Sequence, residues 1–158
     1  MQESRIILRV NEPTSGARVE AALGRLLLRG TRMYLYDRLM DGIEGVDATT
    51  YPALSGLARS GPTSATRLAA IIGLDRTATT RYASRLESAG LLRRAPDPED
   101  ARATRLELTA AGEAAVAAMR DTLTEVFDDL LASWSGPDAD QFAAALERFT
   151  TELEASRS

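Results

Sequence analysis

The sequence predicts a mainly α-helical fold with one short β-hairpin. Residues 63–90 contain two short helical patterns separated by Gly73, a spacing typical of two helices joined by a tight turn. Two runs rich in leucine and arginine follow, at 91–95 and 104–108, and a turn-rich charged segment separates them, as in a β-hairpin. Longer helical patterns lie on both sides. The predicted fold class is therefore a winged helix-turn-helix with a two-stranded β-wing and added N- and C-terminal helices.

The flanking helices follow from apolar periodicity. Residues 16–40 predict one long helix capped by Thr14 or Ser15, although two glycines weaken the pattern, and residues 49–59 predict a second helix. After the hairpin, residues 109–133 predict a long helix, and a Ser-Gly-Pro-Asp interruption precedes a last one. The apolar residues of these two C-terminal helices repeat at three and four residues: Val116, Met119, Leu123, Val126, Leu130, Trp134, Phe142, Leu146, Phe149 and Leu153.

The composition excludes most enzyme chemistries. The 158-residue chain has no cysteine and no histidine, and all 19 basic residues are arginine. Disulfides, zinc fingers, histidine bases and lysine Schiff bases therefore have no residues to form them. We expect no enzyme activity, no cofactor and no metal site. No apolar run approaches the ~20 residues of a membrane span, and no secretory signal is evident, so we expect a cytoplasmic protein without membrane association.

The charge of the chain is unevenly distributed. The net charge is −4, but residues 59–105 carry nine arginines against five acidic residues, a balance of +4. Residues 106–158 carry three arginines against eleven acidic residues, a balance of −8. A basic middle third in an acidic chain is typical of a polyanion-binding module on an acidic scaffold, although a chance cluster on a solvated face gives the same count.

Residues 75–90 have the pattern of a DNA-recognition helix. Asp75 is expected to cap this helix, and an inner face is formed by Thr79, Tyr82, Ala83 and Leu86. Arginine can bind guanine O6 and N7 with two hydrogen bonds, and threonine can contact a base edge or a phosphate. Exposed polar residues without a partner are the alternative interpretation of the outer face. That face carries Arg76, Thr77, Thr80, Arg81 and Ser84, with no acidic residue before Glu87.

The hairpin adds a second basic element. Apolar and charged residues alternate in residues 105–108, as in a strand packed on one side, and residues 97–100 form a strong turn sequence. Arg102 follows this turn, where its guanidinium can enter a narrow minor groove. Because a carboxylate repels phosphate, Asp100 is expected to brace Arg102 or Arg94. A plain surface ion pair is the alternative.

Taken together, these motifs resemble the MarR family of winged-helix regulators over residues 49–112, and over nearly the whole chain with the flanking helices. The cysteine-based and histidine-based sensing found in some relatives does not fit this sequence. Thr79 also departs from the usual apolar residue. The motifs that carry the resemblance are Leu68-Ala69, Gly73, residues 75–81, Arg85-Leu86-Glu87, Gly90-Leu91-Leu92, Arg94, the wing from Asp97 to Arg102, Leu108-Thr109 and Gly112.

The resemblance implies a homodimer with intertwined terminal helices. Each recognition helix would enter a major groove and each wing arginine the flanking minor groove. It also implies that a small molecule, often aromatic or phenolic, can release the DNA. The apolar seams support a dimer independently, because they exceed what one small lobe can cover. A twofold axis then predicts a near-palindromic operator with half-sites about 34 Å apart.

The expected organisation follows from these elements. Residues 1–15 form an N-terminal arm and residues 16–158 a single MarR-type domain. Within it, residues 16–45 and 109–158 are dimerisation helices and residues 49–108 the DNA-binding lobe, with the helix-turn-helix at about 63–89. The expected DNA-binding residues are Thr63, Ser64, Arg76, Thr77, Thr80, Arg81, Ser84, Arg85, Arg94, Asp100 and Arg102.

Function is expected to follow this organisation. We expect a sequence-specific DNA-binding transcriptional regulator, most simply a repressor, whose partners are double-stranded DNA and a second copy of itself. Four aromatic residues can line an effector pocket, although ordinary packing is the favoured explanation of each: Tyr34, Tyr36, Tyr51 and Trp134. The alternative function is a winged-helix protein-interaction module without DNA binding, which acidic or bulky apolar residues on the outer recognition face would indicate.

Overall fold

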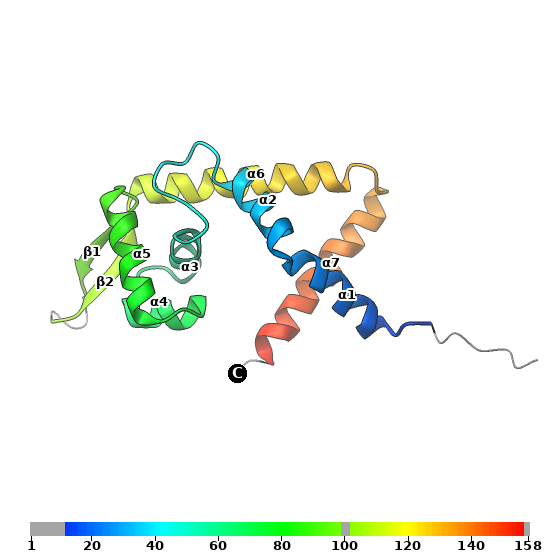
Figure 1. The fold of residues 1–158 in the computed structure, drawn as a ribbon, viewed down its shortest axis with the longest axis horizontal. Helices are drawn as coiled ribbons and strands as arrows, with labels where there is room; N and C mark the ends of the chain where they lie inside the picture. Colours follow the sequence, from blue (N-terminus) through cyan, green and yellow to red (C-terminus); the bar gives the residue numbers. More distant parts are fainter. Residues whose placement is uncertain (1–11, 99–101, 157–158) are drawn as a thin grey trace, which may run out of the picture.

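The computed structural model describes residues 12–98 and 102–156. Within them the predicted fold class is confirmed: the chain is mainly helical and carries one two-stranded antiparallel sheet. Figure 1 shows the sheet and α3 to α5 at one end, α1 and α7 at the other, and α6 spanning the two. The elements are α1 (Ser15–Leu27), α2 (Arg29–Leu39), α3 (Tyr51–Ser60), α4 (Ala65–Ile72), α5 (Arg76–Ser88), β1 (Leu92–Pro96), β2 (Thr104–Leu108), α6 (Ala110–Leu131) and α7 (Gly136–Ala155).

The hydrophobic core lies in the lobe built from α3, α4, α5 and the hairpin, with the first half of α6 and the end of α2 packed against it. Close packing of α3 on α4 depends on Gly56, where a Cβ would lie 2.5 Å from Cγ2 of Ile72. The side chains buried most completely in this core are Leu54, Leu57, Leu68, Leu86, Leu92 and Leu106, together with Thr50 and Thr79.

The predicted hairpin is confirmed, with β1 one residue later than expected. Leu92 pairs with Leu108, and the antiparallel register runs to the pair of Pro96 and Thr104. Leu92 and Leu106 are buried against the lobe, whereas Arg93 is exposed. The expected alternation of buried and exposed residues holds only in part in β2, because Glu107 is buried beside Leu106 and its carboxylate pairs with Arg93 and Arg105.

The prediction of one long helix over residues 16–40 is wrong. The helix ends at Leu27, and Leu28 takes an extended conformation with φ −56° and ψ 139° before α2 begins at Arg29. The hydroxyl of Thr31 donates to the carbonyl of Arg25 across the break at 3.1 Å. The glycines at 24 and 30 weaken the helix on both sides of Leu28, and that weakness is the physical basis for a break without proline.

The sequence predicts that Thr63 caps the helix that begins at Ser64, and this prediction is wrong. Ser64, and not Thr63, caps the helix, because its hydroxyl accepts the N–H of Arg67 at 3.2 Å. Thr63 is only 8% exposed and exchanges two backbone hydrogen bonds with Leu106 of β2, at 3.0 and 2.7 Å. This bridge connects the segment before the helix-turn-helix directly to the hairpin. The caps predicted at Thr14 for α1 and at Asp75 for α5 are confirmed.

The terminal helices are poorly covered within one chain. Neither α1 nor α7 has a buried residue. Along α6, Val116, Met119 and Val126 are buried, whereas Leu130 is 63% exposed. The apolar seam of α7 is exposed along its whole length, at Phe142, Leu146, Phe149 and Leu153. None of the helices in the described ranges is both long and apolar enough to cross a bilayer.

Candidate nucleic-acid interface

Helix α5 separates its buried and exposed faces as the sequence predicts. Thr79, Ala83 and Leu86 are buried on the inner side. The hydroxyl of Thr79 donates to the carbonyl of Asp75 at 2.9 Å, so this buried polar group is satisfied. On the outer side, Thr80 is half-buried and the other four residues are exposed: Arg76, Thr77, Arg81 and Ser84.

The start of α5 combines a capped helix end with an arginine whose side chain is available to an anion. Asp75 accepts the N–H of Ala78 at 2.8 Å, and this bond confirms its role as the cap. Gly73, at φ +69°, makes the left-handed turn that brings α4 and α5 together. The side chain of Arg76 makes no hydrogen bond or ion pair with another described residue, although its backbone carbonyl accepts the hydroxyl of Thr80 at 2.8 Å. The guanidinium of Arg76 therefore remains available to a ligand at the positive end of the helix dipole.

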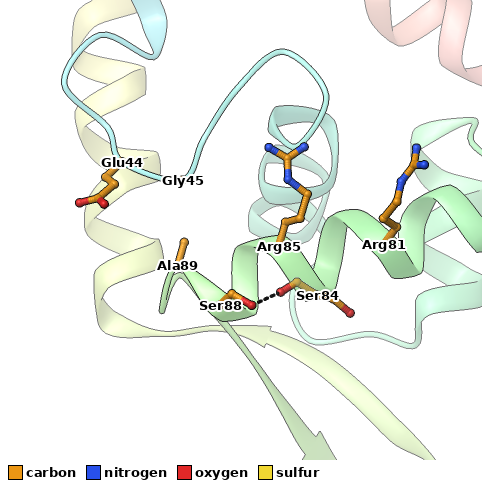
Figure 2. Close-up of a pocket in the computed structure, with 7 residues that line it drawn as sticks. All are labelled: Glu44, Gly45, Arg81, Ser84, Arg85, Ser88 and Ala89. Atoms are coloured by element: carbon orange, nitrogen blue, oxygen red, sulfur yellow. Dashed lines mark hydrogen bonds between the residues drawn. The ribbon is translucent and has the colours of Figure 1, made fainter.

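Arg81 points outward from the middle of α5. Its guanidinium carbon lies 5.2 Å from the ring centre of Tyr82, a distance that favours a cation–π contact. Figure 2 shows Arg81 and Arg85 projecting from one side of α5. With Ser84 and Ser88 they line an open cleft of about 880 Å³, which the segment carrying Glu44 and Gly45 closes on its other side.

Arg85 differs from Arg81 because it is bound within the chain. Its guanidinium donates to the carboxylate of Asp47 at 2.5 Å and to the hydroxyl of Thr49 at 2.9 Å. The hydrogen bond from the Thr49 hydroxyl, joined by those from Arg85 and the backbone, holds the pKa of Asp47 well below its usual range against the opposing effect of partial burial. Asp47 is thus a stable carboxylate.

Arg94 connects β1 to α5. Its Nε donates to Glu87 at 3.0 Å, and a second guanidinium nitrogen donates to the hydroxyl of Ser84 at 3.1 Å. The expected bracing of Arg94 by Asp100 involves a residue outside the described ranges. The partner that is described for Arg94 is a carboxylate of the recognition helix, so the hairpin and the helix are held together as one unit.

The remaining predicted contacts lie on other elements of the lobe. Ser64 is exposed at the start of α4, and Arg102 is exposed at the end of the hairpin, two residues before β2. Thr63 is buried, so its side chain does not belong to this surface. Asp100 lies outside the described residues.

The four predicted effector residues do not form one pocket. The rings of Tyr36 and Tyr51 lie 5.4 Å apart, whereas Trp134 contacts Phe142 near the start of α7 and Tyr34 is 57% exposed. Tyr51 alone among the four lines a small cavity of about 60 Å³. The rest of that lining comes from α2, α3 and α6: Leu39, Ser55, Arg59, Val116, Met119, Arg120 and Leu123.

Sequence reasoning missed three residues that organise this surface: Asp47, Thr49 and Glu87. Asp47 lies in a segment interpreted only as a break between helices, although an aspartate followed at two and three residues by threonine is a capping pattern. Among the described residues, no cluster of three or more His, Cys, Asp or Glu could hold a metal ion.

Comparisons with known proteins agree with this geometry. The MarR family model matches residues 44–103. An uncharacterised HTH-type transcriptional regulator, YxaD of Bacillus subtilis (strain 168), is 28% identical over 103 residues, which are 65% of this chain and 72% of that protein.

Solved structures have the same fold. A crystal structure of a MarR family transcription regulator is 26% identical with a TM-score of 0.66, over 87% of this chain and 93% of that one. A MarR family protein from Bacillus stearothermophilus is 23% identical with a TM-score of 0.72, over 87% of this chain and 96% of that one. The fold and the exposed face of α5 define a winged helix-turn-helix protein. The chain is similar to the MarR family over residues 44–103, and its fold is that of the solved MarR family structures.

Proposed function

We propose that this protein is a transcriptional regulator of the MarR type, that it binds double-stranded DNA through the outer face of α5 and through the hairpin, and that it acts as a repressor. The observation that carries the proposal is the arginine and hydroxyl face of α5, formed by Arg76, Thr77, Thr80 and Arg81. No acidic residue lies on that face before Glu87, and the carboxylate of Glu87 is already bound to Arg94. This surface matches a nucleic acid better than it matches a protein partner.

The residues divide by role. Arg76 and Arg81 have the geometry for two-pronged contacts with guanine in the major groove, and Thr77 and Thr80 for base edges or phosphates. Arg102 at the end of the hairpin is assigned to the minor groove or its phosphates. Ser64 is assigned to a phosphate beside α4.

The exposed seams of α1, α6 and α7 support a homodimer. Leu26 is 54% exposed, Leu130 63% and Leu153 53%, and a second copy can cover all of these side chains through one twofold axis. The dimer would present two α5 helices to successive major grooves, on a near-palindrome with half-sites about 34 Å apart.

Release by a small aromatic or phenolic molecule is the regulatory part of the proposal. The cavity beside Tyr51 joins an aromatic ring to the guanidinium-bearing residues Arg59 and Arg120, a combination suited to an aromatic anion. A pocket for such a ligand usually exceeds about 300 Å³, so binding requires α2 and α6 to separate, and that movement would couple the ligand to the lobe.

The test is to select bound fragments from the source genome and to measure affinity by gel shift. Arg76→Ala and Arg81→Ala should each weaken binding to the selected site by about 1–3 kcal/mol and relax the choice of base. Arg148→Ala, on α7 away from the hairpin in Figure 1, is the control and should leave binding unchanged. Equal affinity of the parent and both α5 variants would reject the site. A complete lack of DNA binding would favour a protein-interaction module instead.

A further inference from the structure

The segment between α2 and α3 packs directly on the end of the recognition helix. A Cβ at Gly45 would lie 2.3 Å from the Cβ of Ala89, far inside contact distance, and Gly45 has φ +82°. Only glycine satisfies both the conformation and the space. Figure 2 shows Gly45 next to Ala89, and both residues belong to the lining of the cleft that Arg81 and Arg85 also line. The segment and the helix are therefore in contact at a point that leaves no room for a side chain at position 45.

A second attachment lies one turn back along α5, at Arg85. One oxygen of Asp47 accepts the N–H of Thr49 at 2.8 Å, the N–H of Thr50 at 3.0 Å and the hydroxyl of Thr49 at 2.6 Å. The other oxygen accepts Arg85, which also donates to the Thr49 hydroxyl. The carboxylate is thus held by its own segment before it binds the guanidinium, so the pair is more ordered than an ordinary exposed ion pair.

This arrangement limits what Arg85 can do toward DNA. Both terminal nitrogens of its guanidinium are already donors to Asp47 and Thr49, and the carboxylate offsets its charge. A phosphate contact would have to use the remaining N–H donors beside a carboxylate that repels phosphate, or to displace these bonds, and either costs affinity. Arg81, one turn earlier on the same side of α5, has no carboxylate partner among the described residues and carries no such cost.

We propose that Arg85 is a positioning residue, which with Asp47 and Thr49 fixes the orientation of α5 on the α2–α3 segment, and that Arg85 does not contact phosphate. This inference rests on the proposed DNA-binding function. In this proposal Asp47 has two roles. Asp47 orients the recognition helix, and its carboxylate offsets the positive charge of Arg85, which would otherwise attract any duplex regardless of sequence.

The dependence of affinity on salt separates a positioning role from a contact. Each phosphate contact contributes about 0.9 to the slope of log affinity against log salt concentration. The protein and its variants are measured as full-length chains, on the selected genomic site and on an unrelated duplex. The parent's preference for the selected site tests the proposed function, and the slopes of the variants test the role of Arg85.

Arg85→Ala is expected to weaken binding to the selected site by roughly fivefold or more, the lower end of what one base contact contributes, with an unchanged salt slope. Asp47→Asn is expected to strengthen binding to the unrelated duplex and to steepen its slope by up to about 0.9, because the released guanidinium can reach a phosphate. Arg85→Lys should not restore the parent's behaviour, since one ammonium does not span Asp47 and Thr49 in the same geometry.

Arg102→Ala is the reference for a contact with the DNA backbone, and its slope should fall by about 0.9. Circular dichroism and sedimentation verify that each variant is folded in the parent's oligomeric state. A slope that falls by about 0.9 in Arg85→Ala would overturn the proposal, and so would an Asp47→Asn variant with the parent's affinity and slope on the unrelated duplex.

Discussion

A Cβ placed on Gly112 would lie 1.9 Å from the carbonyl oxygen of Leu91. The same carbonyl accepts the N–H of Thr109 at 3.1 Å, and the hydroxyl of Thr109 donates to the carbonyl of Gly90 at 2.6 Å. The first turn of α6 is therefore fitted against the segment that joins the recognition helix to the hairpin. This contact links the lobe that carries the proposed DNA surface to the helix that carries part of the proposed dimer seam.

Gly112→Ala should destabilise the protein by about 1–3 kcal/mol, because the carbonyl of Leu91 belongs to the backbone and cannot rotate away from the added methyl group. Urea unfolding followed by circular dichroism measures the change. Ala111→Ser, at the exposed neighbouring position on α6, is the matched control and should change stability by less than about 0.5 kcal/mol. Equal stability of Gly112→Ala and the parent would show that the start of α6 can move away from Leu91.

Much of the lobe follows from local sequence signals. The cap at Asp75, the turn at Gly73 and the bounds of β2 each depend on residues close in the chain, and each is present in the structure. The choice between Thr63 and Ser64 as a cap could not be made locally. Both are hydroxyl residues, and the pairing of Thr63 with Leu106, 43 residues away, decides between them.

Long-range side-chain pairs account for two further features that the sequence did not predict, and the break between α1 and α2 is a third. Arg85 reaches Asp47 across 38 residues, and no periodicity relates the two positions. Arg94 and Glu87 are seven residues apart, but they lie on different elements and meet because the hairpin folds back on α5. The break at Leu28 contains no proline, so the sequence carries no strong local signal for it.

A charge in the α7 seam should separate the two copies of the proposed dimer. Leu146→Glu would bury a carboxylate in an apolar interface, so the variant should sediment as a monomer where the parent sediments as a dimer. Ala144→Glu adds the same charge on the opposite side of the helix, about 200° away, and should remain dimeric. A parent that sediments as a monomer would contradict the dimer, as would a Leu146→Glu variant that remains a dimer.

The link between β1 and α5 should matter for DNA binding more than for stability. Arg94→Ala removes the bonds to Glu87 and Ser84, and the Arg94 side chain is 33% exposed, so the loss of stability should be about 1 kcal/mol or less. Affinity for the selected site should fall, because the hairpin is no longer held to the recognition helix. Gel shift and thermal unfolding measure the two effects. An Arg94→Ala variant with the parent's affinity would show that the link has no role in binding.

Acid should remove the contribution of Asp47 to stability. Its pKa is lowered in the folded protein, so the contribution is complete above the unfolded value of about 3.9 and is lost as the pH falls toward the lowered folded value. The melting temperature of Asp47→Asn should therefore lie below that of the parent at pH 7, and the difference should shrink as the pH falls below about 4. Thermal unfolding at several pH values measures this, and a difference that does not change with pH would contradict it.

The central claim is that a twofold pair of α5 helices and hairpins reads DNA. Hydroxyl-radical footprinting of the protein on its selected genomic site tests this claim most directly. The expected result is two protected segments about 34 Å apart, related by a near-palindrome, with weakened protection at both in Arg76→Ala. A single protected segment without symmetry, or uniform protection that does not depend on sequence, would contradict the claim.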